Sequence, residues 1–240
     1  MPVHHLAGHI ESLFLHNGPL PLPAAVLVVS GGHTSLYLVA REGDYRLLGR
    51  TRDDAAGEAY DKIGKLLGLG YPGGPVVDRL ARNGNDRAVE LPITRLTHAD
   101  RNAPDRDGRL DFSYSGLKTA VLREVETRKA SGRRPLTDTD IADLCASFQR
   151  VVVASLLDRL FAAAQAHGAA SVGVAGGVSA NSRLRADAMS RGDAIGMPVF
   201  IPSLALSTDN AAMIAAAGLR LYAAGVRAGL DLNADASLAL

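Results

Sequence analysis

Residues 25–51 read AVLVVSGGHTSLYLVAREGDYRLLGRT, and this stretch decides the fold of the chain. It contains three apolar runs, at residues 25–30, 35–39 and 45–51, which are separated by turns that contain glycine. Apolar runs of this length between glycine turns are typical of β-strands. Because the connections are so short, consecutive strands must be antiparallel neighbours. The stretch therefore predicts a three-stranded meander.

After the meander, the pattern becomes helical and then alternates between strands and helices. Helices are expected at residues 57–67, through Val76, Val77 and Leu80, at about 116–128 and at 138–167, and the polar residues 84–112 are expected on the surface. A strand at 171–175, a helix at 181–191, a strand at 198–201 and a helix at 209–224 follow. The order βββαβα, with a helical insertion at about 75–167, is that of the ribonuclease-H-like lobe of actin-like (ASKHA) proteins. We therefore expect this α/β fold.

The apolar spacing of residues 5–14 predicts an opening helix, which Asn17-Gly18-Pro19 would end, and a histidine pair in this helix is a candidate metal site. His5 and His9 are four residues apart, so their side chains project from one face of the helix, one turn apart. Asp209, at the start of the last predicted helix, is the candidate third ligand, and the alternative for it is an ordinary helix cap. A zinc peptidase is excluded, because Leu6 follows His5 where the His-Glu-x-x-His pattern needs a glutamate.

Two glycine pairs follow predicted strands. In residues 28–34 (VVSGGHT), backbone N–H groups can approach an anion without a Cβ in the way. Residues 176–181 (GGVSAN) follow a strand and open a helix, where free N–H groups and the positive helix end favour a phosphate. Each turn alone is also explained as an ordinary connection. Together they favour a nucleotide site, and we expect the ion and the nucleotide to share one pocket.

Acidic residues gather around the predicted cleft. Asp53, Asp54, Glu58 and Asp61 lie on or just before one predicted helix, and Asp78 lies on the next. Such carboxylates accept hydrogen bonds from ribose hydroxyls or from amino groups of a ligand, although solvated surface groups are the alternative. The motifs assign no catalytic acid or base.

Composition sets the outer limits of these predictions. With 240 residues, 47% of them hydrophobic, the chain can bury a sizeable core. No apolar run approaches the roughly 20 residues that span a bilayer, and the N-terminus lacks the features of a secretory signal. We therefore expect a cytoplasmic protein without a membrane anchor. The single Cys145 is expected to be a buried structural thiol.

The charge pattern is less informative about partners. The formal net charge is only +1, so the chain as a whole does not attract nucleic acid strongly. The arginine-rich residues 101–109 and 123–134 are either local phosphate contacts or solvated faces. Charge alone leaves both alternatives open.

Seven strings, in order along the chain, together resemble the TsaD (Gcp) family. They are HHLAGH (residues 4–9), VSGGHT (29–34), DDAAGEAYDK (53–62), GYPGGP (70–75), FSYSGLKT (112–119), GGVSAN (176–181) and STDNAAMI (207–214). The resemblance implies an acyltransferase that moves a threonylcarbamoyl group from threonylcarbamoyl-AMP to N6 of the adenosine 3′ of the anticodon, in tRNAs that read ANN codons. AMP is the product that leaves.

The resemblance also implies site residues and ligands. His5, His9 and Asp209 match the family's metal ligands, for one divalent ion that is expected to be iron, with zinc as the alternative. The positions that match the family's adenylate-binding residues are Val28, Val29, Ser30, Gly31, Gly32, Asp61, Gly74, Asp78 and Asn181. On this basis we divide the chain into a metal-binding helix with its connection (1–24), the actin-like lobe (25–225) and a tail (226–240).

The same resemblance implies partners and one departure. Besides tRNA, a TsaB-like protein and a TsaE-like ATPase are the expected partners. Family members begin with a first actin-like lobe, which carries a further phosphate loop and through which the TsaB-like protein is expected to dock, and this sequence starts after it. The alternatives are therefore an ATP-binding or ATPase module of the actin superfamily, or an inactive fragment that corresponds to the C-terminal two-thirds of the family.

Overall fold

The computed structural model describes residues 1–96, 108–131, 135–229, 231–235, 238 and 240. A five-stranded sheet with the order β3-β2-β1-β4-β5 lies at its centre. The strands are β1 (Ala24–Val29), β2 (Thr34–Arg41), β3 (Asp44–Arg50), β4 (Ser171–Ala175) and β5 (Val199–Phe200). β1 pairs antiparallel with β2 and parallel with β4, and β2 pairs antiparallel with β3. The predicted meander is therefore confirmed.

The helices follow the predicted order, with small shifts at their ends. They are α1 (His5–Asn17), α2 (Ala56–Leu66), α3 (Gly73–Ala81), α4 (Ser115–Ala130), α5 (Asp138–Ala166), α6 (Ser182–Ile195), α7 (Leu204–Ser207) and α8 (Ala211–Ala223). Two short 3₁₀ helices, η1 (Gly108–Leu110) and η2 (Gly177–Ala180), lie between them. The sequence did not predict α7, and α8 begins two residues later than expected.

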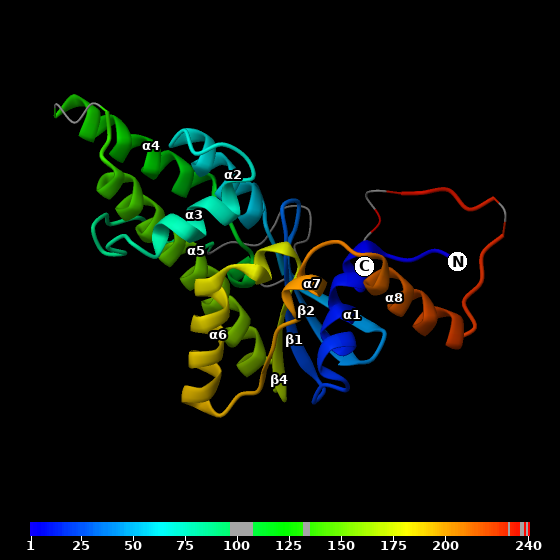
Figure 1. Ribbon diagram of the computed structural model, residues 1–240. Helices are drawn as coiled ribbons and strands as arrows, with labels where there is room; N and C mark the ends of the chain where they lie inside the picture. Colours follow the sequence, from blue (N-terminus) through cyan, green and yellow to red (C-terminus); the bar gives the residue numbers. More distant parts are fainter. Residues whose placement is uncertain (97–107, 132–134, 230, 236–237, 239) are drawn as a thin grey trace.

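Helices cover both faces of the sheet, and β1 separates two hydrophobic cores (Figure 1). Because successive strand residues point to opposite faces, Ala25, Leu27 and Val29 pack with α5 on one side. Residues 24, 26 and 28 of the same strand pack against Leu6, Ile10 and Leu13 of α1 on the other side. All six residues of β1 are buried, as expected for a strand covered on both faces.

The helices α2, α3 and α4 gather at one end of the molecule, and α8 lies at the opposite end against α1 (Figure 1). The long α5 runs from the sheet to α3 and joins the two regions. Among the described residues, no helix combines the length and apolarity that a membrane span needs.

The expectation that residues 84–112 lie on the surface is wrong for several of them. Val89, Leu91, Asp111 and Phe112 are buried. The buried Arg159 of α5 explains part of this, because its guanidinium donates to the carbonyl oxygens of residues 94 and 111 at 2.6 Å each. The arginine-rich stretch 101–109 lies mostly outside the described residues.

Cys145 lies in α5 and is fully buried, as predicted. Burial raises the pKa of its thiol from 9.0 to about 12, so the reactive thiolate is about a thousandfold rarer at neutral pH than in an exposed cysteine. We expect a disulfide reagent at pH 8 to label the folded protein at least about a hundredfold more slowly than the urea-unfolded protein. Equal labelling rates, followed by absorbance, would contradict this burial.

Candidate functional site

The first and last helices meet at a close crossing. α1 begins with a hydrogen bond from the N–H of Leu6 to Nδ1 of His4, and this cap places His5 and His9 on successive turns. A Cβ at Gly8 would lie 3.1 Å from Cδ1 of Ile214 and 3.2 Å from Cγ of Met213. Glycine at position 8 therefore lets the start of α8 approach α1 between the two histidines.

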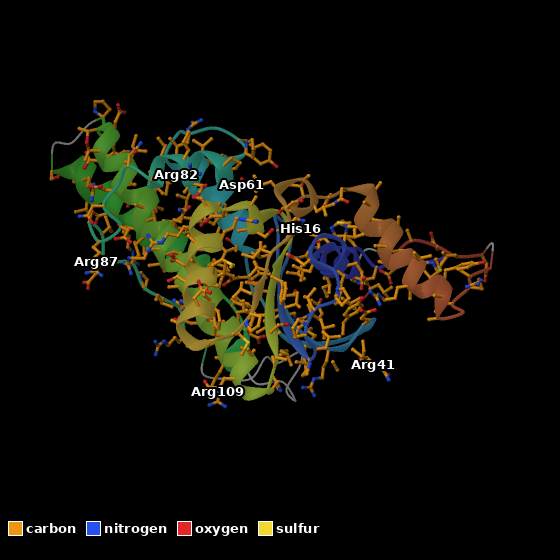
Figure 2. All side chains as sticks on the ribbon, turned by 60° about the horizontal axis from the view of Figure 1, so that its bottom comes forward. His16, Arg41, Asp61, Arg82, Arg87 and Arg109 are labelled. Atoms are coloured by element: carbon orange, nitrogen blue, oxygen red, sulfur yellow. The ribbon has the colours of Figure 1, made fainter. Side chains whose placement is uncertain are left out.

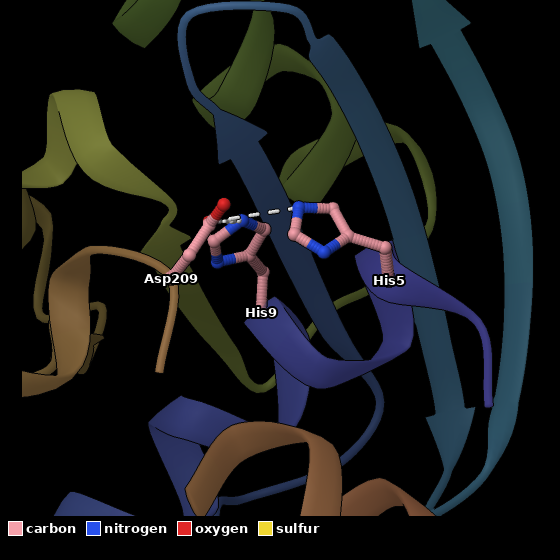
Figure 3. A group of neighbouring side chains, drawn as sticks. All are labelled: His5, His9 and Asp209. Carbon is pink, nitrogen blue, oxygen red and sulfur yellow. Dashed lines mark ion pairs between the residues drawn. The ribbon is translucent and has the colours of Figure 1, made fainter. Parts of the chain in front are cut away.

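Three candidate ligands converge at this crossing (Figure 3). Oδ1 of Asp209 lies 3.2 Å from Nε2 of His9 and 3.6 Å from Nε2 of His5. One potential ligand atom from each of the three side chains lies within 4.8 Å of the other two. The His9 side chain is fully buried, whereas the side chains of His5 and Asp209 are 44% and 75% exposed. The group is thus closed on the α1 side and open to solvent on the other.

The surroundings of His9 suit a metal ion. Both of its ring nitrogens are buried, and within the described part of the chain neither has a hydrogen-bond partner; the approach of Asp209 to Nε2 lacks hydrogen-bond geometry. Burial, reinforced by the neighbouring His5, lowers the pKa of His9, which favours the neutral imidazole that binds metals. Two imidazoles and one carboxylate are a typical donor set for Fe²⁺ and also suit Zn²⁺. The residues present therefore fit a divalent transition metal.

Asp209 does not cap α8. The cap is Asn210, whose Oδ1 accepts a hydrogen bond of 2.9 Å from the N–H of Met213. The alternative in which Asp209 is an ordinary helix cap is therefore wrong.

A buried ion pair fixes α8 against α1 further along both helices. Glu11 of α1, 2% exposed, accepts hydrogen bonds from Nε and Nη2 of Arg220 at 2.9 and 2.8 Å and from the hydroxyl of Tyr45 at 2.7 Å. Arg220 also pairs with Glu42 in the β2–β3 turn and lies over the ring of Phe14. The relative position of His9 and Asp209 thus depends on contacts made three turns further along α8.

A second candidate site is a cavity of about 450 Å³ beside the two glycine turns. A Cβ at Gly57 would lie 2.5 Å from the carbonyl oxygen of Ser30, and one at Gly176 would lie 2.4 Å from that of Val29. These glycines bring the start of α2 and the end of β4 against the first turn. The first turns of α2 and α3 and the N-cap of α6 all contribute to the cavity wall.

The cavity brings together about half of the predicted adenylate-binding residues. Five of them line it: Gly31, Asp61, Gly74, Asp78 and Asn181. Val28 and Val29 instead are fully buried in β1, so their side chains do not reach the cavity. Ser30 and Gly32 belong to the adjoining turn and do not form the wall.

Sequence reasoning missed Gln149 of α5, which organises one wall. Its amide donates to Oδ1 of Asp78 at 3.2 Å and accepts from Nδ2 of Asn181 at 2.8 Å. Asp78 also accepts from the hydroxyl of Ser182 at 2.8 Å and from Arg82 at 3.2 Å. One amide inside a run of apolar helix residues was the only signal for Gln149.

The other predicted acidic residues serve the fold instead. Asp53 accepts hydrogen bonds from the hydroxyls of Ser113 and Ser115 and from the N–H of Tyr114, so it anchors the segment before α4. Asp54 and Glu58 both pair with Lys62. None of these three residues lines the cavity.

The glycine turn at residues 31–33 connects the two candidate sites. Gly31 lines the cavity, and the ring centroid of His33 lies 6.3 Å from that of His5. The cavity wall does not include His5, His9 or Asp209. In the described residues the two sites are therefore neighbours on either side of one turn, where we expected one shared pocket.

Comparison with known proteins places this geometry in a family. Residues 1–216 match the family described as TsaD, tRNA N6-adenosine threonylcarbamoyltransferase. The chain belongs to the TsaD family. A TsaD relative from Koribacter versatilis (strain Ellin345) is 47% identical over 99% of this chain, and one from Anaeromyxobacter dehalogenans (strain 2CP-1 / ATCC BAA-258) is 51% identical over 97%. The chain spans 71% and 66% of these two relatives, so it corresponds to about two-thirds of a TsaD protein.

A solved structure supports the TsaD-like fold. Full-length HypF, in its phosphate- and nucleotide-bound form, matches 92% of this chain with a TM-score of 0.65 and 13% identity, and 43% of HypF is covered. At this identity the likeness concerns the fold alone. Together with the sheet order, it confirms the predicted actin-like lobe.

Proposed function

We propose that this chain carries the metal site and most of the adenylate site of a tRNA N6-adenosine threonylcarbamoyltransferase. The observation that carries the proposal is the convergence of His5, His9 and Asp209 on one point next to a nucleotide-sized cavity. Membership of the TsaD family supplies the reaction, because relatives about 50% identical over nearly the whole chain bear this name.

His5, His9 and Asp209 would hold one divalent ion, with iron as our first choice and zinc as the second. A bound ion would supply a Lewis acid that polarises a carbonyl oxygen of the donor. The open side of the site, at His5 and Asp209, leaves room for that oxygen. Burial of His9 keeps its ring fixed in position for binding.

The cavity would bind the adenylate part of the donor. The positive ends of α2, α3 and α6 at its wall, with the N–H groups of the two glycine turns, favour the phosphate. Asp61 and Asp78, from α2 and α3, are suited to accept hydrogen bonds from ribose hydroxyls. Figure 2 shows Asp61 and Arg82 on the side of the molecule that carries α2 and α3.

In the proposed reaction, the protein mainly positions its substrates. N6 of the acceptor adenosine attacks the carbamoyl carbon, a bond from N6 to that carbon forms, and the bond from that carbon to the phosphate oxygen breaks. AMP leaves, and N6 releases one proton to the solvent. Holding the two reactants together, with N6 facing the carbamoyl carbonyl, lowers the barrier without a covalent protein intermediate.

We further propose tRNA as the acceptor, TsaB-like and TsaE-like proteins as partners, and the cytoplasm as the location. The test is reconstitution of the chain, joined to the further segment that its longer relatives carry, with these partners on threonylcarbamoyl-AMP and unmodified tRNA. Mass spectrometry of the digested tRNA should reveal the modified nucleoside. Its absence from the complete mixture would refute the transferase assignment.

A second candidate function is an ATPase module of the actin superfamily, which the fold and the cavity favour. Such a module has no need of His5, His9 and Asp209. ATP hydrolysis by the chain that is unaffected by Asp209→Ala, together with no tRNA modification, would select this second function.

Gly74→Val tests the adenylate cavity. Gly74 is the second residue of α3 and lines the cavity, and a Cβ there meets no atom within 4 Å. The valine side chain should therefore occupy ligand space without disturbing the fold. We expect the Kd for AMP, measured by calorimetry, to rise at least about tenfold, which corresponds to about 1.4 kcal/mol.

Gly116→Val is the matched control, because Gly116 is the second residue of α4, lies away from the cavity, and a Cβ there would make only an ordinary contact of 3.8 Å with Oγ1 of Thr94. Both variants should unfold at similar temperatures. AMP binding that survives Gly74→Val unchanged would show that the adenylate binds elsewhere.

A further inference from the structure

Tyr71 is 85% exposed, the most exposed large hydrophobic side chain among the described residues. It directly precedes Pro72, which lines the cavity. Isolated apolar side chains on a surface are common, so exposure alone indicates nothing. Its place next to the wall of a nucleotide-sized cavity distinguishes Tyr71 from the other exposed apolar side chains.

The loop that carries Tyr71 is held at both ends. Gly68 and Gly70 have φ angles of +72° and +84°, which favour glycine and define the turn. The N–H of Leu69 donates to the carbonyl oxygen of Gly64 at 2.8 Å, and the N–H of Gly73 donates to Oδ1 of Asp61 at 2.8 Å. The tyrosine is therefore presented in a fixed place, at low entropic cost to a ligand that stacks on it.

Positive side chains flank this loop. Lys65 of α2 and Arg79 of α3 are exposed, and neither makes an ion pair with the described residues. Arg79 lines a surface hollow together with Leu69, which places it beside the loop. Arg82, one turn further along α3, lies at the cavity wall and is 62% exposed. An exposed aromatic ring with cations around it is the combination that binds single-stranded nucleic acid.

We infer that Tyr71 is a stacking platform for an unpaired base of the acceptor RNA loop, with Lys65 and Arg79 as contacts to its phosphates. The inference rests on the proposed function, because it assumes that the RNA approaches a donor bound in the cavity. Loop bases of RNA are typically recognised by stacking on aromatic side chains, whereas base-paired stems are not. Tyr71 is thus a substrate-binding residue on the acceptor side.

The test is RNA binding by the chain and its Tyr71→Ala variant. The probe is a synthetic RNA hairpin with an unmodified adenosine in its loop, and fluorescence anisotropy reports its Kd. We expect Tyr71→Ala to raise the Kd about tenfold, because the variant loses the stacking contact with one base. Tyr71→Trp should retain wild-type affinity, because it keeps a flat aromatic face.

Two controls separate this effect from others. Tyr222→Ala removes another exposed tyrosine, 57% exposed on α8, and should leave RNA binding unchanged. The Kd for AMP should be unchanged in Tyr71→Ala. The unfolding temperature should also stay the same, because the side chain makes little contact with the protein.

The possible failures are distinguishable. Wild-type RNA binding that persists in Tyr71→Ala overturns the inference and leaves the proposed function intact. Weaker AMP binding with unchanged RNA binding also overturns it, because Tyr71 then covers the donor. A wild-type chain without measurable affinity for the hairpin counts against both the inference and the proposed acceptor.

Discussion

Replacement of His9 by alanine is expected to weaken binding of Fe²⁺ or Zn²⁺ by about a hundredfold or more. Loss of an indirect contact to a metal ligand already weakens binding about 10- to 100-fold, and His9 would be a direct ligand. Its ring is fully buried and its nitrogens have no other hydrogen-bond partner within the described residues, so no neighbouring group replaces it. Competition with a chromophoric chelator under anaerobic conditions measures the affinity.

His16→Ala is the matched control, because His16 is an exposed histidine in the last turn of the same helix (Figure 2). The His16→Ala variant should bind the metal ion with the affinity of the wild type. In the wild type, saturating metal should raise the unfolding temperature, since an ion that binds only the folded state stabilises it. This metal-dependent shift should vanish in His9→Ala, and a full shift there would refute the ligand assignment.

Replacement of Glu11 by alanine is expected to destabilise the folded chain by about 2–3 kcal/mol, because Arg220 loses its hydrogen bonds to a buried carboxylate but keeps its pair with Glu42. Although burial opposes the charge of Arg220, its hydrogen bonds to Glu11 and Glu42 raise its pKa, so it stays charged and loses its main partner. The Tyr45 hydroxyl loses its acceptor as well. Urea unfolding followed by circular dichroism measures the change.

Asp158→Ala provides the comparison for an exposed pair. Oδ1 of Asp158 lies 2.6 Å from Nη1 of Arg191, but the two side chains are 47% and 39% exposed. Such surface ion pairs contribute less than about 1 kcal/mol to stability. A loss of stability in Glu11→Ala no larger than that in Asp158→Ala would show that the α1–α8 ion pair contributes little. The difference between the two variants is therefore the informative quantity.

Local sequence patterns predicted most of the elements, because they depend on near neighbours along the chain. The spacing of His5 and His9 needed only a helix to place both rings on one face. The meander followed from apolar runs and short turns. The local pattern left Asp209 open between a third ligand and a helix cap, and the resemblance to TsaD favoured the ligand.

Contacts between distant segments explain what the sequence did not reveal. Asp53 and Asp61 are both carboxylates on or just before α2, but only Asp53 binds Ser113 and Ser115, which the fold brings to it from about sixty residues away. These contacts give Asp53 a structural role. Gln149 supports the cavity wall from behind, because α5 brings its amide to Asp78 and Asn181. Residues 89 and 91 are buried because their side chains pack in the core, and the hydrogen bond from Arg159 to the carbonyl oxygen of residue 94 holds the same segment there. No local pattern contains this information.

The approach of α8 to α1 has a consequence for how the chain comes apart. His5 and Asp209 are 204 positions apart in sequence (209 − 5), yet they lie side by side, so an ion bound there would close a loop that includes nearly the whole fold. Closing a long loop removes more conformational entropy from the unfolded chain than closing a short one. A bound ion at this site would therefore oppose unfolding that begins at either terminus. Only a completely folded chain brings all three ligands together, so metal binding would report that the chain is fully folded.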